Sequence, residues 1–479
     1  MEIDPVGASV SLKYMSGLHY FPYFREYSRI HSLQFCYIFE ETGIMRVRYF
    51  VPLVICLLLL TIYVPLHAQT VVTTAADSTC VRFIQTAFQQ VGTNCANLEA
   101  GSLCYGHPNV SANIDETAVK NFSKIADRLS LENFTSIHTE DYDPAENNFG
   151  IAVMNIQASL PRAFPGKGAV MMAFGETTIT NAVTPEDALI LPEKAIDIIV
   201  GANGADLYNV PTGFNVPSQP FGSVPKGTTL QADGISVDAQ WLRIYAPHKE
   251  TFDENVVAWI KTASLVQGLD LSNLPTITAE SYTPMQSFFL TTKFEEPRCK
   301  NAVPSLLYIQ GPKDTLVDVT VDGAHIRFGS TILLRLLPPG NILQVVVLSG
   351  LGVIFPDTPD EIILPPGFET LLCLAPIPEG GNKNTPLVTK NCGSAKPRLL
   401  SFDEMQTLST DFSNLIPENL QYYNTVVPRL VCPSGVGAVI CTLELSDPLF
   451  AAELSNLCQD GTLPPETCAQ LSLPSIFNN

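Results

Sequence analysis

The sequence contains none of the short motifs that mark the common enzyme classes. It has no HExxH zinc motif, no GxSxG nucleophile elbow, no GxxxxGK[ST] phosphate loop and no GxGxxG dinucleotide fingerprint. It also has no CxxC pair, which excludes a thioredoxin-type redox motif and a zinc ribbon. Histidine is scarce, with seven in 479 residues. We therefore assign no catalytic residue and expect neither a cofactor nor a metal centre.

Positive charge is also scarce. The chain carries 27 Lys and Arg against 47 Asp and Glu, a formal net charge of −20. The first 68 residues hold five residues of each sign, so the whole acidic excess belongs to the rest of the chain. Nucleic-acid binding through phosphates needs clustered Lys and Arg. We therefore expect no nucleic-acid partner, and electrostatic adsorption to anionic envelope polymers is disfavoured as well.

One apolar run near the N-terminus predicts export. Val51–Leu66 follows two arginines and ends just before the small residue Ala68, the pattern of a secretory signal peptide over residues 45–68. At 16 residues it is shorter than the ~20 that a membrane span requires. Residues 1–44 fit two readings: either translation begins at Met45, or they form the cytoplasmic tail of an uncleaved anchor. The mature protein is then secreted or at the cell surface, or alternatively a single-pass membrane protein.

The cysteine count supports export. Beyond the signal region ten cysteines remain, and an even number in an oxidising compartment is most simply paired as disulfides. A local pair such as Cys458 with Cys468 is expected, although the full connectivity does not follow from the sequence. Cys104 lies three residues before His107, but neighbouring cysteines favour a structural disulfide there over a catalytic thiol. The disulfide candidates are Cys80, Cys95, Cys104, Cys299, Cys373, Cys392, Cys432, Cys441, Cys458 and Cys468.

Hydrophobic patterning predicts a mainly β, multi-domain protein. Residues 77–190 begin with apolar residues spaced three and four apart, which indicates a helix, and continue with buried strands over 151–160 and 169–174. This pattern favours a β-sandwich-like N-terminal domain. Residues 395–475 turn helical, with a capping box at Ser401–Glu404. Because this last region is too small to bury a large core, we predict that its disulfides stabilise it.

Residues 198–268 form short alternating strands that contain both tryptophans of the chain. The stretches Trp241-Leu242-Arg243-Ile244 and Ala258-Trp259-Ile260 resemble the third and closing strands of a bacterial SH3-type (SH3b) domain. The resemblance implies a small barrel with aromatic side chains beside a peptide or glycan groove, and Trp259 in its core. The opening segment and the long acidic loop over 246–255 depart from the family pattern. The ligand-binding candidates are Tyr208, Trp241, Arg243 and Tyr245, with plain barrel packing as the alternative.

The pattern of residues 281–380 predicts a series of consecutive β-strands. The I-R-x-G-S-T stretch at Ile326–Thr331 and the L-x-P-G turn at Leu364–Gly367 resemble the extracytoplasmic β-domain of FecR-type proteins. Together with the Leu103–Gly106 stretch and the apolar strand over 149–161, the order of segments resembles a family of exported bacterial proteins, best represented in the Chloroflexota. That resemblance implies an envelope or secreted protein without a known activity.

Three functions are compatible with these observations. The first is a non-catalytic exported protein that binds an envelope glycan, a peptide or a protein partner through the SH3b-like module. The second is a membrane-anchored sensor of the FecR type, which requires an uncleaved signal segment. The third is an enzyme acting on cell-wall material, which requires a site with a strongly perturbed acid or histidine.

Overall fold

The computed structural model describes the chain from residue 75 to residue 374 with short gaps, and in shorter pieces beyond. The gaps are 115–116, 161–167, 215–216, 248–254, 269, 294–303, 313–314, 330, 339–340 and 357. The later pieces are 389–391, 397–400, 404, 415–421, 429–431, 442–444, 448–459, 461 and 463–469. The predicted signal peptide and the extension before it lie outside the described residues, as does nearly all of the helix predicted after Ser401.

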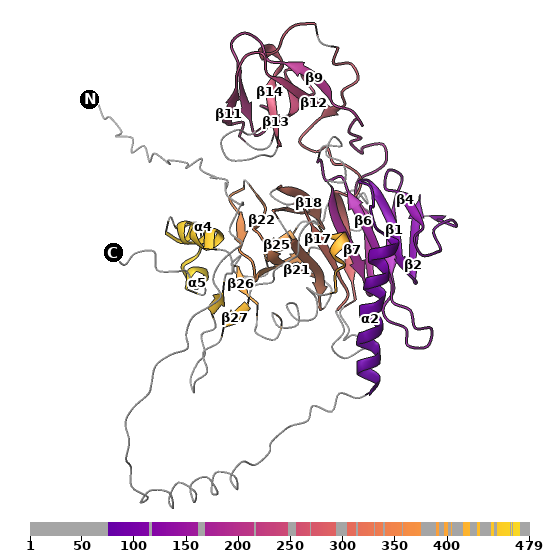
Figure 1. The fold of residues 1–479 in the computed structure, drawn as a ribbon. Coiled ribbons are helices and arrows are strands. Elements are labelled where there is room, and N and C mark those ends of the chain that lie inside the picture. Colours follow the sequence, from indigo (N-terminus) through magenta and orange to yellow (C-terminus); the bar gives the residue numbers. More distant parts are fainter. Residues whose placement is uncertain are drawn as a thin grey trace, which may run out of the picture.

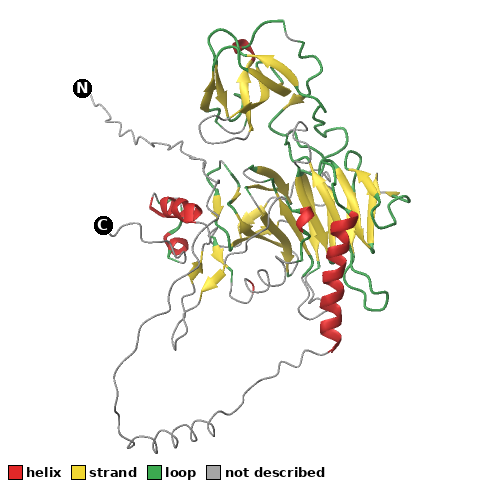
Figure 2. Ribbon diagram, viewed as in Figure 1, coloured by secondary structure: helices red, strands yellow, loops and turns green. Residues whose placement is uncertain are grey.

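Three mainly antiparallel β-sheets and few helices make up the described chain, which confirms the predicted mainly β class (Figures 1 and 2). The ten-stranded sheet has the order β25 (Thr389–Asn391), β24 (Phe368–Leu374), β21 (Ile342–Ser349), β20 (Thr331–Leu337), β17 (Leu306–Gln310), β7 (Ala169–Phe174), β6 (Ile151–Ile156), β1 (Ser102–His107) and β4 (Arg128–Ser130), with β26 (Arg398–Leu399) on β24. The nine-stranded sheet has the order β23 (Ile362–Leu364), β22 (Gly352–Ile354), β19 (Ala324–Phe328), β18 (Val317–Val321), β16 (Ser287–Thr292), β8 (Thr177–Asn181), β5 (Ser136–Thr139), β2 (Val110–Ile114) and β3 (Thr117–Ala118).

The third sheet belongs to a separate part of the chain, residues 196–277, which we call the module. Its seven strands have the order β11 (Pro220–Val224), β10 (Ala205–Tyr208), β14 (Asn255–Lys261), β13 (Trp241–Pro247), β12 (Thr229–Ser236) and β15 (Thr276–Ile277), with β9 (Ile196–Ile199) on β12. A short 3-10 helix, η1 (Thr262–Ser264), follows β14. In Figure 1 the module stands apart from the two larger sheets.

The two larger sheets are shared between chain segments on either side of the module. Strand β7 pairs with β17 in one sheet, and β8 pairs with β16 in the other. One hydrophobic core contains residues from both sheets and both segments. The sequence predicts separate β-domains over 77–190 and 281–380, whereas the structure joins them into a single β-sandwich, because each segment supplies the edge strands that the other needs. The module is therefore an insertion between β8 and β16, reached by a first connector (182–195) and a second connector (278–286).

The two sheets of the sandwich differ in how deeply they are buried. Every residue of β6 and of β17 in the ten-stranded sheet is buried. Strands β5 and β19 of the nine-stranded sheet alternate buried and half-buried residues. A continuous apolar strand suits a sheet covered on both faces, and alternation suits one face in water. The helix α2 (Ala75–Asn94) packs on β1 and supplies part of the cover.

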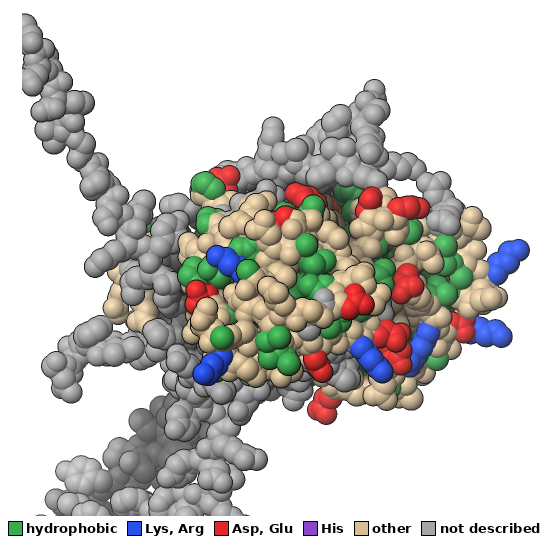
Figure 3. All heavy atoms as spheres, turned by 90° about the horizontal axis from the view of Figure 1, so that it is seen from above, with side chains coloured by type: hydrophobic (Ala, Val, Ile, Leu, Met, Phe, Trp, Pro, Cys, Tyr) green, Lys and Arg blue, Asp and Glu red, His purple; other side chains and the backbone are tan. Residues whose placement is uncertain are grey.

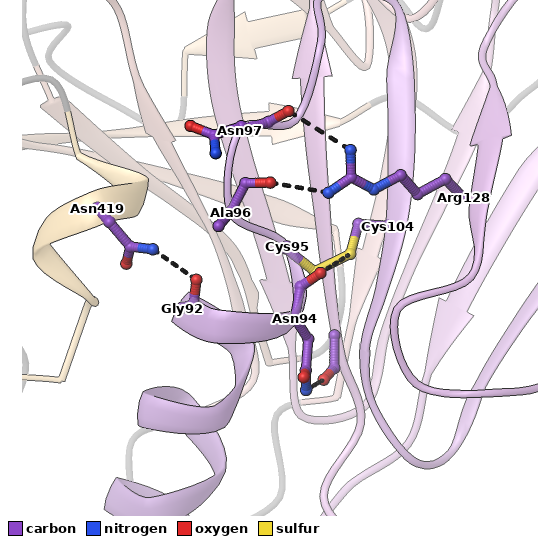
Figure 4. The surroundings of a disulfide bond; sticks show 9 residues. Gly92, Asn94, Cys95, Ala96, Asn97, Cys104, Arg128 and Asn419 are labelled. Atoms are coloured by element: carbon purple, nitrogen blue, oxygen red, sulfur yellow. Dashed lines mark hydrogen bonds between the residues drawn. A yellow bond between two sulfur atoms is a disulfide. The ribbon is translucent and has the colours of Figure 1, made fainter.

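The C-terminal end of α2 is held by residues from distant parts of the chain (Figure 4). Cys95 forms a disulfide with Cys104 of β1. The Arg128 guanidinium donates hydrogen bonds to the carbonyls of Ala96, at 2.7 Å, and of Asn97 just after the helix. The Asn419 amide donates to the Gly92 carbonyl. The last turn of α2 has no basic residue of its own. Asn419 satisfies a carbonyl that a helix end leaves unpaired, and Arg128 holds the turn that follows the helix.

The described C-terminal pieces contain short elements. They are the 3-10 helix η3 (Glu418–Leu420), the hairpin of β27 (Arg429–Val431) and β28 (Thr442–Glu444), and the helices α4 (Pro448–Gln459) and α5 (Pro465–Cys468). The predicted disulfide between Cys458 and Cys468 joins α4 to α5 and is confirmed. Within the described part of the chain, no helix combines the length and the hydropathy needed to cross a membrane.

Candidate binding site on the module

The module has a hydrophobic core of its own, and its tryptophans lie outside that core. Strand β13 sends Leu242 and Ile244 into the core, while Trp241 and Arg243 alternate onto the opposite face. The core residues are Ile198, Val200, Leu207, Val224, Leu230, Ala232, Leu242, Ile244, Ala258, Ile260, Leu265 and Leu274. The face opposite the core is therefore where the predicted site residues gather.

Strand register brings four side chains of β13 and β14 together on this face. Trp241 lies opposite Lys261, and Arg243 lies opposite Trp259. Directly opposed residues in an antiparallel pair share a face of the sheet. Tyr208 of β10 is in turn opposite Trp259. The sequence predicts that Trp259 packs in the barrel core; it is buried, but in this second cluster rather than in the core.

Four aromatic rings form what we call the aromatic cluster: Tyr208, Phe214, Trp241 and Trp259. The Tyr208 ring meets Trp241 edge-on, with centroids 4.9 Å apart, and Phe214 meets Trp259 edge-on at 5.6 Å. The two tryptophans are buried, whereas Tyr208 and Phe214 are half-buried. The exposed Lys261 places its Nζ 5.2 Å from the Tyr208 ring centre and 5.4 Å from that of Trp241. The tryptophans thus make a floor, and Tyr208, Phe214 and Lys261 make an accessible rim.

The chain itself fills the space above this floor. Leu189 and Leu191 of the first connector and Ile277 of β15 pack with the two tryptophans in one buried cluster. Between the two leucines, Ile190 is 42% exposed. The Leu189 amide donates a 2.9 Å hydrogen bond to the Tyr282 carbonyl of the second connector. The two connectors are therefore tied together where they pass the aromatic cluster.

Arg243 takes part in a second, polar contact. Its Nε lies 3.2 Å from an oxygen of Asp233 on β12, and both side chains are at most 5% exposed. Its Nη2 donates a hydrogen bond to the carbonyl of Ser159, which follows β6 in the sandwich. The Ser159 backbone has a positive φ of 55°, and its amide donates to Thr283 Oγ1 of the second connector. Arg243 thus joins the module to the sandwich, and its charge is paired inside the protein.

The predicted site residues are brought together in part. Tyr208, Trp241 and Arg243 lie on one face of the module, while the side chain of Tyr245 lies outside the described part of the structure. Sequence reasoning missed the rim residues Phe214 and Lys261. The position of Lys261 two residues after Trp259 on one strand was a signal that the two share a face.

Two buried side chains of the sandwich have pKa values that are shifted by burial. Burial raises the pKa of Asp322 to about 7, against a lowering effect of its hydrogen bond from the Leu290 amide. Burial lowers the pKa of His107, whose Nδ1 lies 2.8 Å from the Phe149 carbonyl oxygen. Asp322 is 2% exposed and His107 is 5% exposed, so both are interior groups. Among the described residues, no cluster of His, Cys, Asp or Glu is large enough to hold a metal ion.

The surface of the described residues agrees with the acidic composition. On the face shown in Figure 3, acidic side chains and small hydrophobic patches are spread over a largely polar surface, and Lys and Arg do not gather into a basic patch. Comparison with known proteins gives no assignment: no family model, no curated protein and no solved structure matches this chain.

Proposed function

We propose that this chain is an exported, non-catalytic binding protein whose module, an SH3-type fold, contacts a peptide, glycan or protein partner at the cell envelope. The observation that carries the proposal is the position of the aromatic cluster, outside the module's own core and with an accessible rim. Aromatic rings at such a place supply a large apolar surface, and their edges are suited to polar contacts.

The chemistry of the rim favours a peptide. Half-buried Tyr208 and Phe214 suit apolar side chains of an extended segment, as in aromatic-lined grooves that bind peptides. Exposed Lys261 holds its ammonium above two rings and can still pair with an acidic group of the ligand. In a chain of net charge −20, this lysine provides a local positive charge next to an apolar surface.

Disulfide bonding supports the export part of the proposal. Six cysteines of the described chain are disulfide-bonded: Cys80, Cys95, Cys104, Cys373, Cys458 and Cys468. Disulfides persist in oxidising compartments and are rare in the cytosol. They occur both in the sandwich and in the C-terminal pieces, so an oxidising environment is favoured for the whole mature chain.

Co-sedimentation of the oxidised protein with purified envelope from the source cells tests the proposal. Two rim variants, Lys261→Glu and Phe214→Ala, each have a matched control at an exposed module residue outside the aromatic cluster: Lys226→Glu and Phe221→Ala. We expect the wild type and both controls to pellet, and the rim variants to lose at least ten-fold in the bound fraction. Absence of pelleting in the wild type, or equal pelleting of rim and control variants, would contradict the proposal.

A further inference from the structure

The first connector lies on the aromatic cluster in the manner of a bound peptide. Leu189 is 6% exposed, Ile190 is 42% exposed and Leu191 is 1% exposed. Leu189 and Leu191 both pack with the tryptophans while Ile190 between them faces water, which is the alternation typical of an extended segment. Peptide-binding domains that take extended segments use pockets for alternate side chains in the same way.

This contact is distinct from ordinary core packing. The module's core is complete without the two leucines, because the twelve residues of that core include neither tryptophan and no residue of the first connector. The cluster that contains Leu189 and Leu191 is a second one, formed on the opposite face of β13 and β14. The leucines therefore occupy a surface site that the module presents outside its folded core.

We propose that residues 187–192 are an intramolecular ligand of the module, and that the partner recognised in trans is an extended peptide with two leucine-like side chains two residues apart. This inference rests on the proposed function, because it names the ligand class of the same site. An occupied site makes the module self-inhibited: a partner must displace Leu189 and Leu191 before it reaches Trp241 and Trp259.

Hydrogen bonds between the module, the connectors and the sandwich keep the intramolecular ligand within reach. The hydrogen bond from Arg243 to the Ser159 carbonyl and the hydrogen bond from Leu189 to Tyr282 hold the module and both connectors at the sandwich. A tethered segment has an effective concentration in the millimolar range. A free peptide of equal intrinsic affinity therefore binds the wild type only weakly, because the competent, open fraction is small.

A labelled synthetic peptide covering residues 184–194 provides the test. Its binding to the full oxidised protein is measured by fluorescence anisotropy for the wild type, for Leu191→Ser and for the matched control Ile190→Ser, which changes an exposed neighbour. We expect Leu191→Ser to bind the peptide at least ten-fold more tightly than the wild type and Ile190→Ser. A peptide with both leucines replaced by serine serves as the ligand control and should not bind.

A folded Leu191→Ser variant that binds the peptide no better than Ile190→Ser would overturn the inference. Leu189→Ser, which removes the other buried leucine, is measured beside it with the same expectation. A third arm uses the wild type alone. In that arm, excess peptide added to the wild type should accelerate hydrogen exchange at the Leu189 amide at least several-fold, whereas the serine peptide should not. Unchanged exchange with both peptides would likewise contradict the intramolecular ligand.

The test of the intramolecular ligand and the test of the proposed function can fail independently. Peptide binding by Leu191→Ser without envelope pelleting of either Leu191→Ser or the wild type would support the intramolecular ligand and reject the envelope partner. Pelleting that depends on the rim, with no peptide binding by any variant, would support the envelope partner and reject the intramolecular ligand.

Discussion

The Arg243 guanidinium on β13 donates a hydrogen bond to the backbone carbonyl of Ser159, which lies 84 residues earlier in the chain. The same guanidinium is paired with Asp233 inside the module. One side chain therefore connects a strand of the insertion with the loop that ends β6 of the sandwich. Together with the leucines of the first connector, this contact fixes where the module sits.

Loss of Asp233 alone should destabilise the protein severely. Asp233→Ala leaves the Arg243 charge buried without its carboxylate, which typically lowers the free energy of unfolding by about 3–5 kcal/mol. Replacing both partners with apolar residues, as in Asp233→Leu with Arg243→Met, should recover most of that loss. Urea unfolding of the two variants and the wild type measures the difference. A double variant less stable than Asp233→Ala would contradict a buried, mutually compensating pair.

Asp322 should make stability depend on pH. It occupies the turn between β18 and β19, next to Gly323, with a φ of 50°, and its Oδ1 accepts a 3.1 Å hydrogen bond from the Leu290 amide. Its Oδ2 has no hydrogen-bond partner among the described residues. Burial raises its pKa from 3.8 to about 7, so the folded protein binds this proton more tightly than the unfolded chain.

The contribution of Asp322 to stability is therefore complete below about pH 4 and is lost as the pH rises to about 7. The loss amounts to at most about 4 kcal/mol. Asp322→Asn keeps a residue that tolerates positive φ and removes the titration. We expect this variant to gain stability relative to the wild type as the pH rises from 4 to 8, measured by urea unfolding at each pH. A wild-type minus variant difference that stays constant over this range would show that Asp322 does not titrate there.

The disulfide between Cys95 and Cys104 should contribute measurably to stability. It closes a loop with a sequence separation of nine at the end of α2. The chain-entropy model gives about 3 kcal/mol for a loop of this order. Calorimetry of the oxidised double variant Cys95→Ser with Cys104→Ser should show a correspondingly lower melting temperature than the oxidised wild type. An unchanged melting temperature would contradict a stabilising role.

Local patterns predict the elements of this fold well. The apolar run Ala169–Phe174 is predicted as a strand and matches β7, and the helix predicted at the start of residues 77–190 matches α2. The disulfide between Cys458 and Cys468 is the local pair named from the sequence. In each case neighbouring residues carry the whole signal.

The pairing of strands that lie far apart in the chain could not be predicted from the sequence. Strand β7 pairs with β17, whose residues lie far along the chain, and nothing local distinguishes this edge from an edge left free. The candidate site likewise combines residues close together in the sequence with residues far apart in it. Trp241 and Arg243 stand two apart on β13 and share a face, but their partners Leu191 and Ser159 come from the connector and from the sandwich. A single sequence carries no pattern that links residues so far apart.

Tryptophan fluorescence tests the central claim most directly, because the chain has only two tryptophans and both lie beneath the first connector. Acrylamide quenching should be weak in the wild type and in Ile190→Ser, and at least several-fold stronger in Leu191→Ser, since removing the leucine opens Trp241 and Trp259 to the quencher. Equal quenching of the wild type and a folded Leu191→Ser variant would contradict the claim that the connector fills the aromatic site.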